Sequence, residues 1–163
     1  MTNSNDVKRI SFSALKNWTE CPHRHKLIYV DKLPHFSGNE YTAFGTAIHE
    51  VCEETIPVDS GNPIEVFNRA FSRELNTLRD QGHDLNTRLV NEMMEQAIPI
   101  CEQVLPAVKA HFGKFQVVSV EEEILEPINE FESFGTSFKG FIDMVIKTED
   151  DKYHIIDWKT CTW

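Results

Sequence analysis

Apolar residues recur every three or four positions through most of the chain up to residue 112, which predicts a helical region. Ser11 is a suitable N-cap, and the pattern after it is interrupted at Cys21-Pro22, so we expect a short helix, a proline break and a second helix. Pro99 and Pro106 each remove a backbone donor and should kink the last helix of this region. The longer helices are predicted over residues 41–54, 66–79 and 85–112.

After Gly113 the pattern becomes one of short apolar runs separated by polar turns, which is typical of strands. The predicted strands cover residues 115–125, 134–146 and 153–158, and a polar turn over 148–151 joins the last two. The expected fold class is therefore α+β: helices in 1–112 pack on a three-stranded antiparallel meander in 113–163. A chain of 163 residues buries about 70% of its unfolded surface, so one domain is the default expectation.

Composition narrows the class of protein. Hydrophobic residues make up 40% of the chain and charged residues 26%, and no apolar run approaches the ~20 residues of a membrane span. We therefore expect no membrane partner. The first residues lack the apolar core of a secretory signal, and the four cysteines form no Cys-x-x-Cys pair. These features predict free thiols and a reducing, cytoplasmic location.

The charge is unevenly distributed. Sixteen basic and 26 acidic residues give a net charge of −10, which argues against a broad nucleic-acid surface. Residues 7–32, the basic N-terminal segment, instead carry six basic residues and two acidic ones. Two interpretations stay open: a solvated helix face, or an edge that contacts DNA phosphates. The residues concerned are Lys8, Arg9, Lys16, Arg24, Lys26 and Lys32.

Charged residues also interrupt the last two predicted strands. Asp143 lies in one, and Asp157 and Lys159 lie at the end of the other. Side-chain direction has period two in a strand, so Asp157 and Lys159 share a face, and antiparallel pairing can bring Asp143 close to them. Two carboxylates beside a lysine suit a Mg²⁺ site for phosphate chemistry, although a cross-strand salt bridge explains the same pattern.

Four motifs together resemble those of one enzyme family. Residues 140–143 (GFID) followed by 155–160 (IIDWKT) resemble the catalytic hairpin of the PD-(D/E)xK nuclease superfamily, in its RecB-like exonuclease branch. Residues 11–15 (SFSAL) with Cys21-Pro22 resemble the N-terminal signature of that branch, and residues 44–49 (FGTAIH) resemble its Gly-x-x-x-His motif. The motifs occur in the family's order, so the resemblance implies a restriction-endonuclease-like core and a DNA-hydrolysing exonuclease for replication, recombination or repair.

The resemblance also implies roles for individual residues. Asp143 and Asp157 would be metal ligands, Lys159 would position the attacking water, and the backbone carbonyl of Trp158 would face the metal. His49, which alone would more often be a structural helix histidine, becomes an additional ligand. The metal would be Mg²⁺, with Mn²⁺ a good substitute because of the histidine.

A glutamate on the preceding strand is a further candidate. Related enzymes often carry one near the site, and the chain has three in succession, Glu121, Glu122 and Glu123. Neighbouring strand residues alternate faces, so either Glu121 and Glu123 or Glu122 alone can point inward. We favour Glu121 as the ligand, and a solvated acidic edge is an equally good interpretation.

Two departures from the family pattern matter. Some members hold an iron–sulfur cluster, but here Cys21 is matched by only Cys161 after the lysine, which argues against a cluster. Family members also continue into a helix and a strand that complete the sheet. We therefore expect either a second polypeptide or self-association to complete it, which makes half of a split nuclease the alternative function. A third possible function is that of a nuclease-derived binding module with a structural role.

Overall fold

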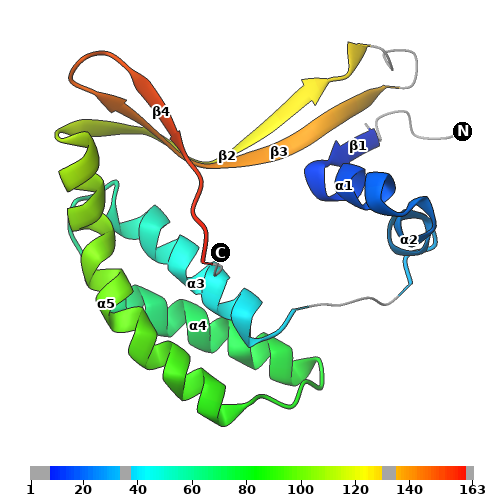
Figure 1. Ribbon diagram of the computed structural model, residues 1–163, viewed down its shortest axis with the longest axis horizontal. Helices are drawn as coiled ribbons and strands as arrows, with labels where there is room; N and C mark the ends of the chain where they lie inside the picture. Colours follow the sequence, from blue (N-terminus) through cyan, green and yellow to red (C-terminus); the bar gives the residue numbers. More distant parts are fainter. Residues whose placement is uncertain (1–7, 34–37, 130–134, 161–163) are drawn as a thin grey trace, which may run out of the picture. The chain divides into compact units, whose positions relative to one another are not determined.

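The computed structural model describes residues 8–33, 38–129 and 135–160 (Figure 1). The chain forms two compact units. One consists of Met1–Phe36 with Glu122–Ile142, and the other of Ser37–Glu121 with Asp143–Trp163. The mixture of helices with one mixed sheet confirms the α+β fold class.

The first unit contains the predicted helix, proline break and second helix. Strand β1 (Lys8–Ser11) leads into α1 (Phe12–Glu20), where the Ser11 hydroxyl accepts a hydrogen bond of 3.2 Å from the Ala14 backbone amide. Pro22 occupies the first turn of α2 (Pro22–His25), where a missing amide proton costs nothing. The π-helix η1 (Lys26–Val30) continues from it.

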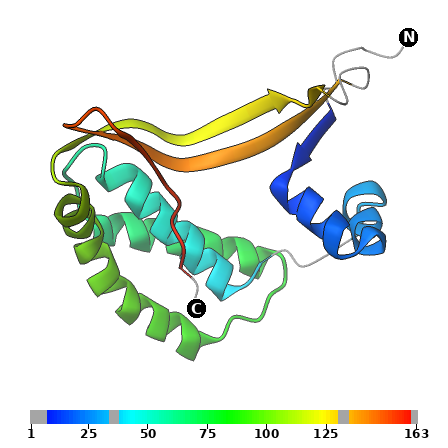
Figure 2. The same cartoon turned by 45° about the horizontal axis from the view of Figure 1, so that its top comes forward.

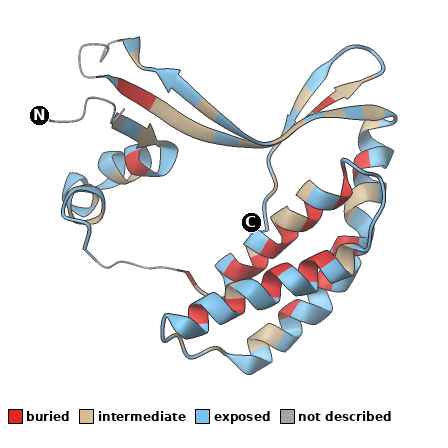
Figure 3. Cartoon of the chain, turned by 180° about the vertical axis from the view of Figure 1, so that it is seen from behind, coloured by how far each residue is buried: buried red, intermediate tan, exposed pale blue. Residues whose placement is uncertain are grey.

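The second unit contains the three longer predicted helices, α3 (Glu40–Thr55), α4 (Pro63–Asp80) and α5 (Thr87–Phe112). Each begins at an asparagine whose side chain accepts backbone amide protons of the first turn: Asn39, Asn62 and Asn86. Pro99 and Pro106 lie inside α5 as predicted. Figure 3 shows the buried residues of these helices concentrated on the faces that they turn toward one another.

Strands β2 (Phe115–Pro127), β3 (Thr136–Thr148) and β4 (Tyr153–Ile156) form the predicted meander. The β3–β4 pair is antiparallel, with Met144 opposite Ile156 and Lys147 opposite Tyr153. The predicted start of the middle strand, Phe134, lies outside the described residues. The predicted end of the last strand is too late, because the ladder stops at Ile156 and leaves Asp157 and Trp158 beyond it.

Strand β1 was not predicted. It pairs in parallel with β3, from Lys8 opposite Thr136 to Ser11 opposite Lys139. The described sheet therefore has four strands and is mixed, where the sequence analysis expected three antiparallel ones, and β3 pairs with each of the other three. Only four residues long and half basic, β1 lacks the apolar run that identifies a strand in sequence.

The core of the second unit joins β3 to the helices. Met144 and Ile146 of β3 are fully buried, and they belong to one cluster with side chains of α3, α4 and α5. The rings of Phe44, Phe67 and Phe71 lie within this cluster, with centroids 5.1 to 6.0 Å apart. Asp143 immediately precedes Met144, so the core fixes the backbone of a candidate ligand.

Candidate metal centre

Helix α3 and strand β3 bring the candidate ligands His49 and Asp143 together. Nδ1 of His49 lies 3.5 Å from Oδ2 of Asp143, and the two side chains are 27% and 13% exposed. His49 follows the buried Ile48 on α3, so its ring emerges at the border of the packed face. A half-buried imidazole facing a nearly buried carboxylate offers one nitrogen and several oxygen lone pairs to the same space.

The segment after β4 reaches the same place. The Trp158 backbone amide, two residues after the last paired residue Ile156, donates a hydrogen bond of 2.8 Å to Oδ2 of Asp143, which immediately precedes the paired Met144. In both ribbon views the segment then passes beside α3 (Figures 1 and 2). A Cβ atom added to Gly45 would lie 3.0 Å from the Thr160 hydroxyl, so glycine permits this close approach.

Asp157 and Lys159 are in the exposed part of this segment. Nζ of Lys159 lies 2.6 Å from Oδ1 of Asp157 and donates a hydrogen bond of 3.2 Å to the Trp158 carbonyl oxygen. The ion pair is thus within one segment, whereas the sequence left open a salt bridge across two strands. Their side chains are 63% and 52% exposed. Both groups can rearrange around a ligand, since exposed ion pairs are weak.

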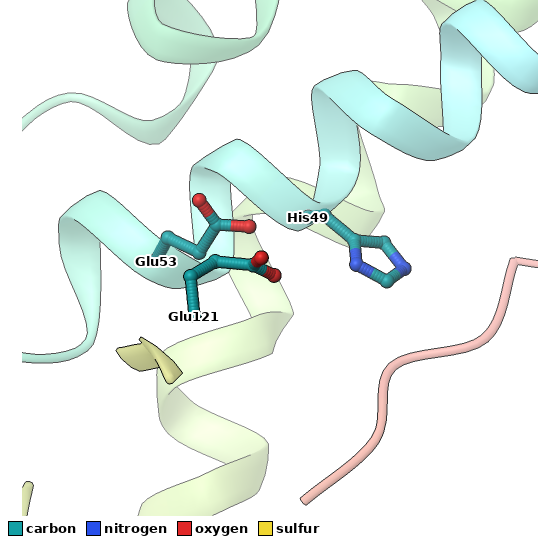
Figure 4. A group of neighbouring side chains, drawn as sticks. All are labelled: His49, Glu53 and Glu121. Carbon is teal, nitrogen blue, oxygen red and sulfur yellow. The ribbon is translucent and has the colours of Figure 1, made fainter. Parts of the chain in front are cut away.

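Glu53 and Glu121 form a second group of possible ligands with His49. One ligand atom from each of these three residues lies within 4.8 Å of the other two. Figure 4 shows the carboxylates of Glu53 and Glu121 next to each other, on the side of α3 that carries the His49 ring. Glu53 was missed from the sequence, although it follows His49 by four positions and therefore lies on the same helix face. Glu121 was among the sequence candidates and has a left-handed backbone with φ of 47°.

The electrostatics of this cluster favour a cation. Burial raises the pKa of Glu53 to about 7, and the negative charge of Glu121, a hydrogen bond to Glu121 and the charges of Glu50 and Asp143 add to the shift. Glu50 is compensated, because hydrogen bonds from Arg73 and Arg69 lower its pKa. Glu53 has no such partner among the causes of its shift. A bound cation would remove this electrostatic penalty.

A hollow of about 320 Å³ adjoins these side chains in the second unit. It is lined by Gly45, Thr46, His49, Glu50, Glu53 and Glu121. The hollow opens the His49 and Glu53 side of α3 to a ligand.

The family model of the PD-(D/E)XK nuclease superfamily matches residues 9–162. The chain belongs to the PD-(D/E)XK nuclease superfamily. No curated protein matches it. Membership identifies the chain as a metal-dependent nuclease, and the side chains fit a hard divalent cation: carboxylates of Asp143, Glu53 and Glu121 provide hard oxygen donors, and His49 provides one nitrogen.

The candidate DNA contacts lie in the first unit of this PD-(D/E)XK chain. Arg9 is in β1, Lys16 in α1, Arg24 in α2 and Lys26 in η1, and all four are exposed. Lys8 begins β1, and its side chain is outside the description. These residues remain candidates for DNA binding.

The cysteines and helices bear on two other expectations. Cys21, Cys52 and Cys101 are free thiols, as predicted, and burial raises the pKa of Cys52 to about 12. Cys161 lies outside the described residues. Among the helices of the described ranges, none has the length and apolarity needed to cross a membrane.

Proposed function

We propose that the chain is a metal-dependent DNA exonuclease of the RecB-like branch. The observation that carries the proposal is the convergence on Asp143: His49 lies 3.5 Å from Oδ2, and the Trp158 amide of the Asp-x-Lys segment donates to the same oxygen at 2.8 Å. Three motifs distant in sequence therefore meet at one carboxylate. Because nucleases of this superfamily hydrolyse phosphodiester bonds, we interpret the convergence as a catalytic metal site.

The proposed ligands are Asp143, Asp157, His49 and the backbone carbonyl of Trp158, with Glu121 as a further candidate. A bound metal would supply Lewis acidity toward the scissile phosphate and lower the pKa of the attacking water. Asp157 is paired to Lys159 at the surface, and its exposed carboxylate would be available to hold the metal. The oxygen-rich set favours Mg²⁺, and the imidazole makes Mn²⁺ an effective substitute.

Lys159 performs the remaining chemical tasks. Its Nζ is already within hydrogen-bonding distance of the Trp158 carbonyl and the Asp157 carboxylate, so it lies beside two of the proposed ligands. From there the ammonium group orients the attacking water by a hydrogen bond and offsets negative charge that develops on the phosphate. The hydrogen bond from the Trp158 amide to Asp143 fixes the backbone next to Lys159 and so limits how far Lys159 can move.

Several finer assignments belong to the same proposal. We propose a role in DNA replication, recombination or repair, one nuclease domain that comprises both units, and no iron–sulfur cluster. The free thiols of Cys21, Cys52 and Cys101 support a reducing compartment such as the cytoplasm. The basic N-terminal segment supports DNA as the partner.

The test compares linear end-labelled DNA with closed circular single strands of the same sequence. An exonuclease degrades the linear DNA in Mg²⁺ or Mn²⁺, spares the circle, and is inactive in excess chelator. Ca²⁺ should bind without supporting turnover, because it is larger and activates water poorly. Lys159→Ala, purified identically, controls for contaminating nuclease. Degradation of the circle would replace exonuclease with endonuclease, and cleavage in chelator would contradict the metal mechanism.

A second candidate is a nuclease that needs another chain to complete its sheet. The observation in its favour is β4, whose Tyr153 and Ile155 side chains are 64% and 70% exposed and point to one face. Apolar side chains on a short exposed strand promote pairing or packing with another polypeptide. This candidate predicts a dimer, or no cleavage until a partner is added, and Ile155→Asp should prevent association. Robust cleavage by a monomer would rule it out.

A further inference from the structure

Helices α1 and η1 present aromatic rings to solvent beside basic side chains. Phe12 and Trp18 of α1 are 66% and 54% exposed, and Tyr29 of η1 is also exposed. A single exposed ring is ordinary, but Trp18 and Tyr29 both contact His25 and therefore form one exposed aromatic patch that water solvates poorly. Such a surface is suited to bind a ligand with flat apolar faces.

The rings of Trp18 and Tyr29 are already ordered, because both contact the ring of His25. The His25 ring lies against Tyr29 in a stacked arrangement, with centroids 4.9 Å apart, and Trp18 meets the same imidazole edge-on at 5.6 Å. Asn17 reaches the Tyr29 hydroxyl at 3.5 Å and is itself held by the Ser13 carbonyl at 2.9 Å. Binding to this arrangement therefore loses less side-chain freedom than binding to isolated rings.

Basic side chains flank the rings, and their present ion pairs are weak. Lys16 and Arg24 both lie 3.9 Å from Glu20, too far for a hydrogen bond, and all three side chains are exposed. Lys26 pairs with Asp31 at 2.5 Å, also at the surface. Exposed pairs contribute little stability, so phosphates can replace these carboxylates.

We propose that this aromatic–basic surface binds single-stranded DNA. Its residues are Lys16, Trp18, Arg24, His25, Lys26 and Tyr29. Bases would stack on the exposed rings of Trp18 and Tyr29, and phosphates would contact Lys16, Arg24 and Lys26. Single strands expose the base faces that a duplex hides, and stacking beside cations is how proteins bind them without reading sequence.

Charge identifies the occupant of this surface. Three cations of this surface, Lys16, Arg24 and Lys26, face only two acidic partners, Glu20 and Asp31, within a chain of net charge −10. The surface therefore attracts an anion and disfavours a second copy of the chain. Rings beside cations match the alternating bases and phosphates of a nucleic acid strand. The inference rests on the proposed nuclease function, and it adds a binding surface and a preference for single strands.

The experiment measures anisotropy of a labelled oligothymidine and of an oligomer of the same length with abasic sites. The protein carries Lys159→Ala and is kept in chelator, so that nothing is cleaved. Trp18→Ala and Tyr29→Ala should each weaken oligothymidine binding about 5- to 100-fold and affect the abasic oligomer little. Trp18→Phe, which keeps a flat ring, should retain most of the affinity. Tyr41→Ala removes an exposed tyrosine of α3 in the other unit and should change nothing.

The cations are tested separately by salt dependence. Lys16→Gln and Arg24→Gln should weaken both oligomers alike and reduce the slope of log affinity against log salt by about 0.7 for each phosphate that the variant no longer neutralises. Equal affinity of the parent protein for both oligomers, or unchanged affinity in Trp18→Ala, would overturn the proposal. A change in oligomeric mass without a change in DNA affinity would also overturn it and assign the surface to a protein interface.

The two proposals fail differently. A wild-type chain that binds oligothymidine through Trp18 yet cleaves no DNA in Mg²⁺ disproves an exonuclease that acts without a partner chain and leaves the surface intact. A chain that cleaves DNA while Trp18→Ala binds normally disproves the surface and leaves the nuclease function intact.

Discussion

The backbone amide of Trp158 donates a hydrogen bond of 2.8 Å to Oδ2 of Asp143, the oxygen that also lies 3.5 Å from Nδ1 of His49. One carboxylate thus links α3, β3 and the segment that carries Lys159. The ladder between β3 and β4 ends at Met144 and Ile156, so this side-chain bond continues the pairing where backbone bonds stop. Asp143 is therefore both a proposed ligand and an anchor.

Two substitutions of Asp143 distinguish its role as a proposed ligand from its role as an anchor. Asp143→Ala should abolish cleavage and lower the free energy of unfolding by about 1–3 kcal/mol, because the partly buried Trp158 amide loses its acceptor. Asp143→Asn keeps an acceptor oxygen and removes the charge, so stability should recover while cleavage does not. Thermal unfolding and a nuclease assay on both variants provide the measurement. Equal stability of the two variants would contradict the anchoring role.

Asp157 and Lys159 should behave in the opposite way. Asp157→Ala and Lys159→Ala should each abolish cleavage, yet change the free energy of unfolding by less than about 1 kcal/mol, because both side chains are exposed and their ion pair is a surface one. Nuclease assays paired with urea unfolding provide the check. Cleavage persisting in either variant would remove that residue from the mechanism.

Strand periodicity and antiparallel pairing predicted that Asp143 can lie close to Asp157 and Lys159. In the structure the contact to Asp143 comes from the backbone amide of Trp158, the residue between them, while Asp157 and Lys159 pair with each other at the surface. The same rules predicted too late an end for β4, because an apolar run in the sequence does not reveal where the backbone hydrogen bonds of a strand stop. Its last paired residue is Ile156, and Asp157 begins the segment that leaves the sheet.

Glu121 illustrates what sequence rules omit. Strict alternation leaves three successive glutamates ambiguous, since it fixes the faces only for regular backbone. In the structure Glu121 has φ of 47°, a conformation that interrupts regular strand geometry, and its carboxylate joins His49 and Glu53. Glu53 was predictable in principle from its four-residue spacing to His49, but only once the histidine was taken as a ligand.

The raised pKa of Glu53 gives a pH test on the metal-free protein. The folded value of about 7 lies above the ordinary 4.5, so folding favours the protonated form. The stability that depends on this proton is complete below pH 4.5 and disappears as the pH rises through about 7. Wild type should therefore lose stability relative to Glu53→Gln across that interval, in chelator.

Melting temperatures of wild type and Glu53→Gln, recorded from acid to mildly alkaline pH, measure the effect. Glu95→Gln makes the same change of charge on the exposed surface of α5 and should follow the wild-type curve. If the difference between wild type and Glu53→Gln did not vary with pH, the electrostatic account of the cluster would be wrong.

Gly45 controls how closely the Asp-x-Lys segment approaches α3. A Cβ at this position would lie 3.0 Å from the Thr160 hydroxyl, a contact that a small rotation of Thr160 relieves. Gly45→Ala should therefore stabilise the protein by about 0.5–1 kcal/mol, the usual gain of alanine over glycine inside a helix, and retain activity. Gly45→Val adds two methyl groups against the same neighbour and should push the segment away.

Lys159 precedes Thr160, so this displacement moves the proposed catalytic ammonium group. A shift of about 1 Å in a catalytic group can reduce turnover about 100-fold, and we expect a loss of that order in kcat for Gly45→Val with the helices still folded. Adding Thr160→Ala removes the clashing hydroxyl and should restore part of the rate. Steady-state kinetics of the single and double variants, with circular dichroism as the folding control, make the comparison. Wild-type turnover in Gly45→Val would show that Lys159 does not depend on the contact between α3 and this segment.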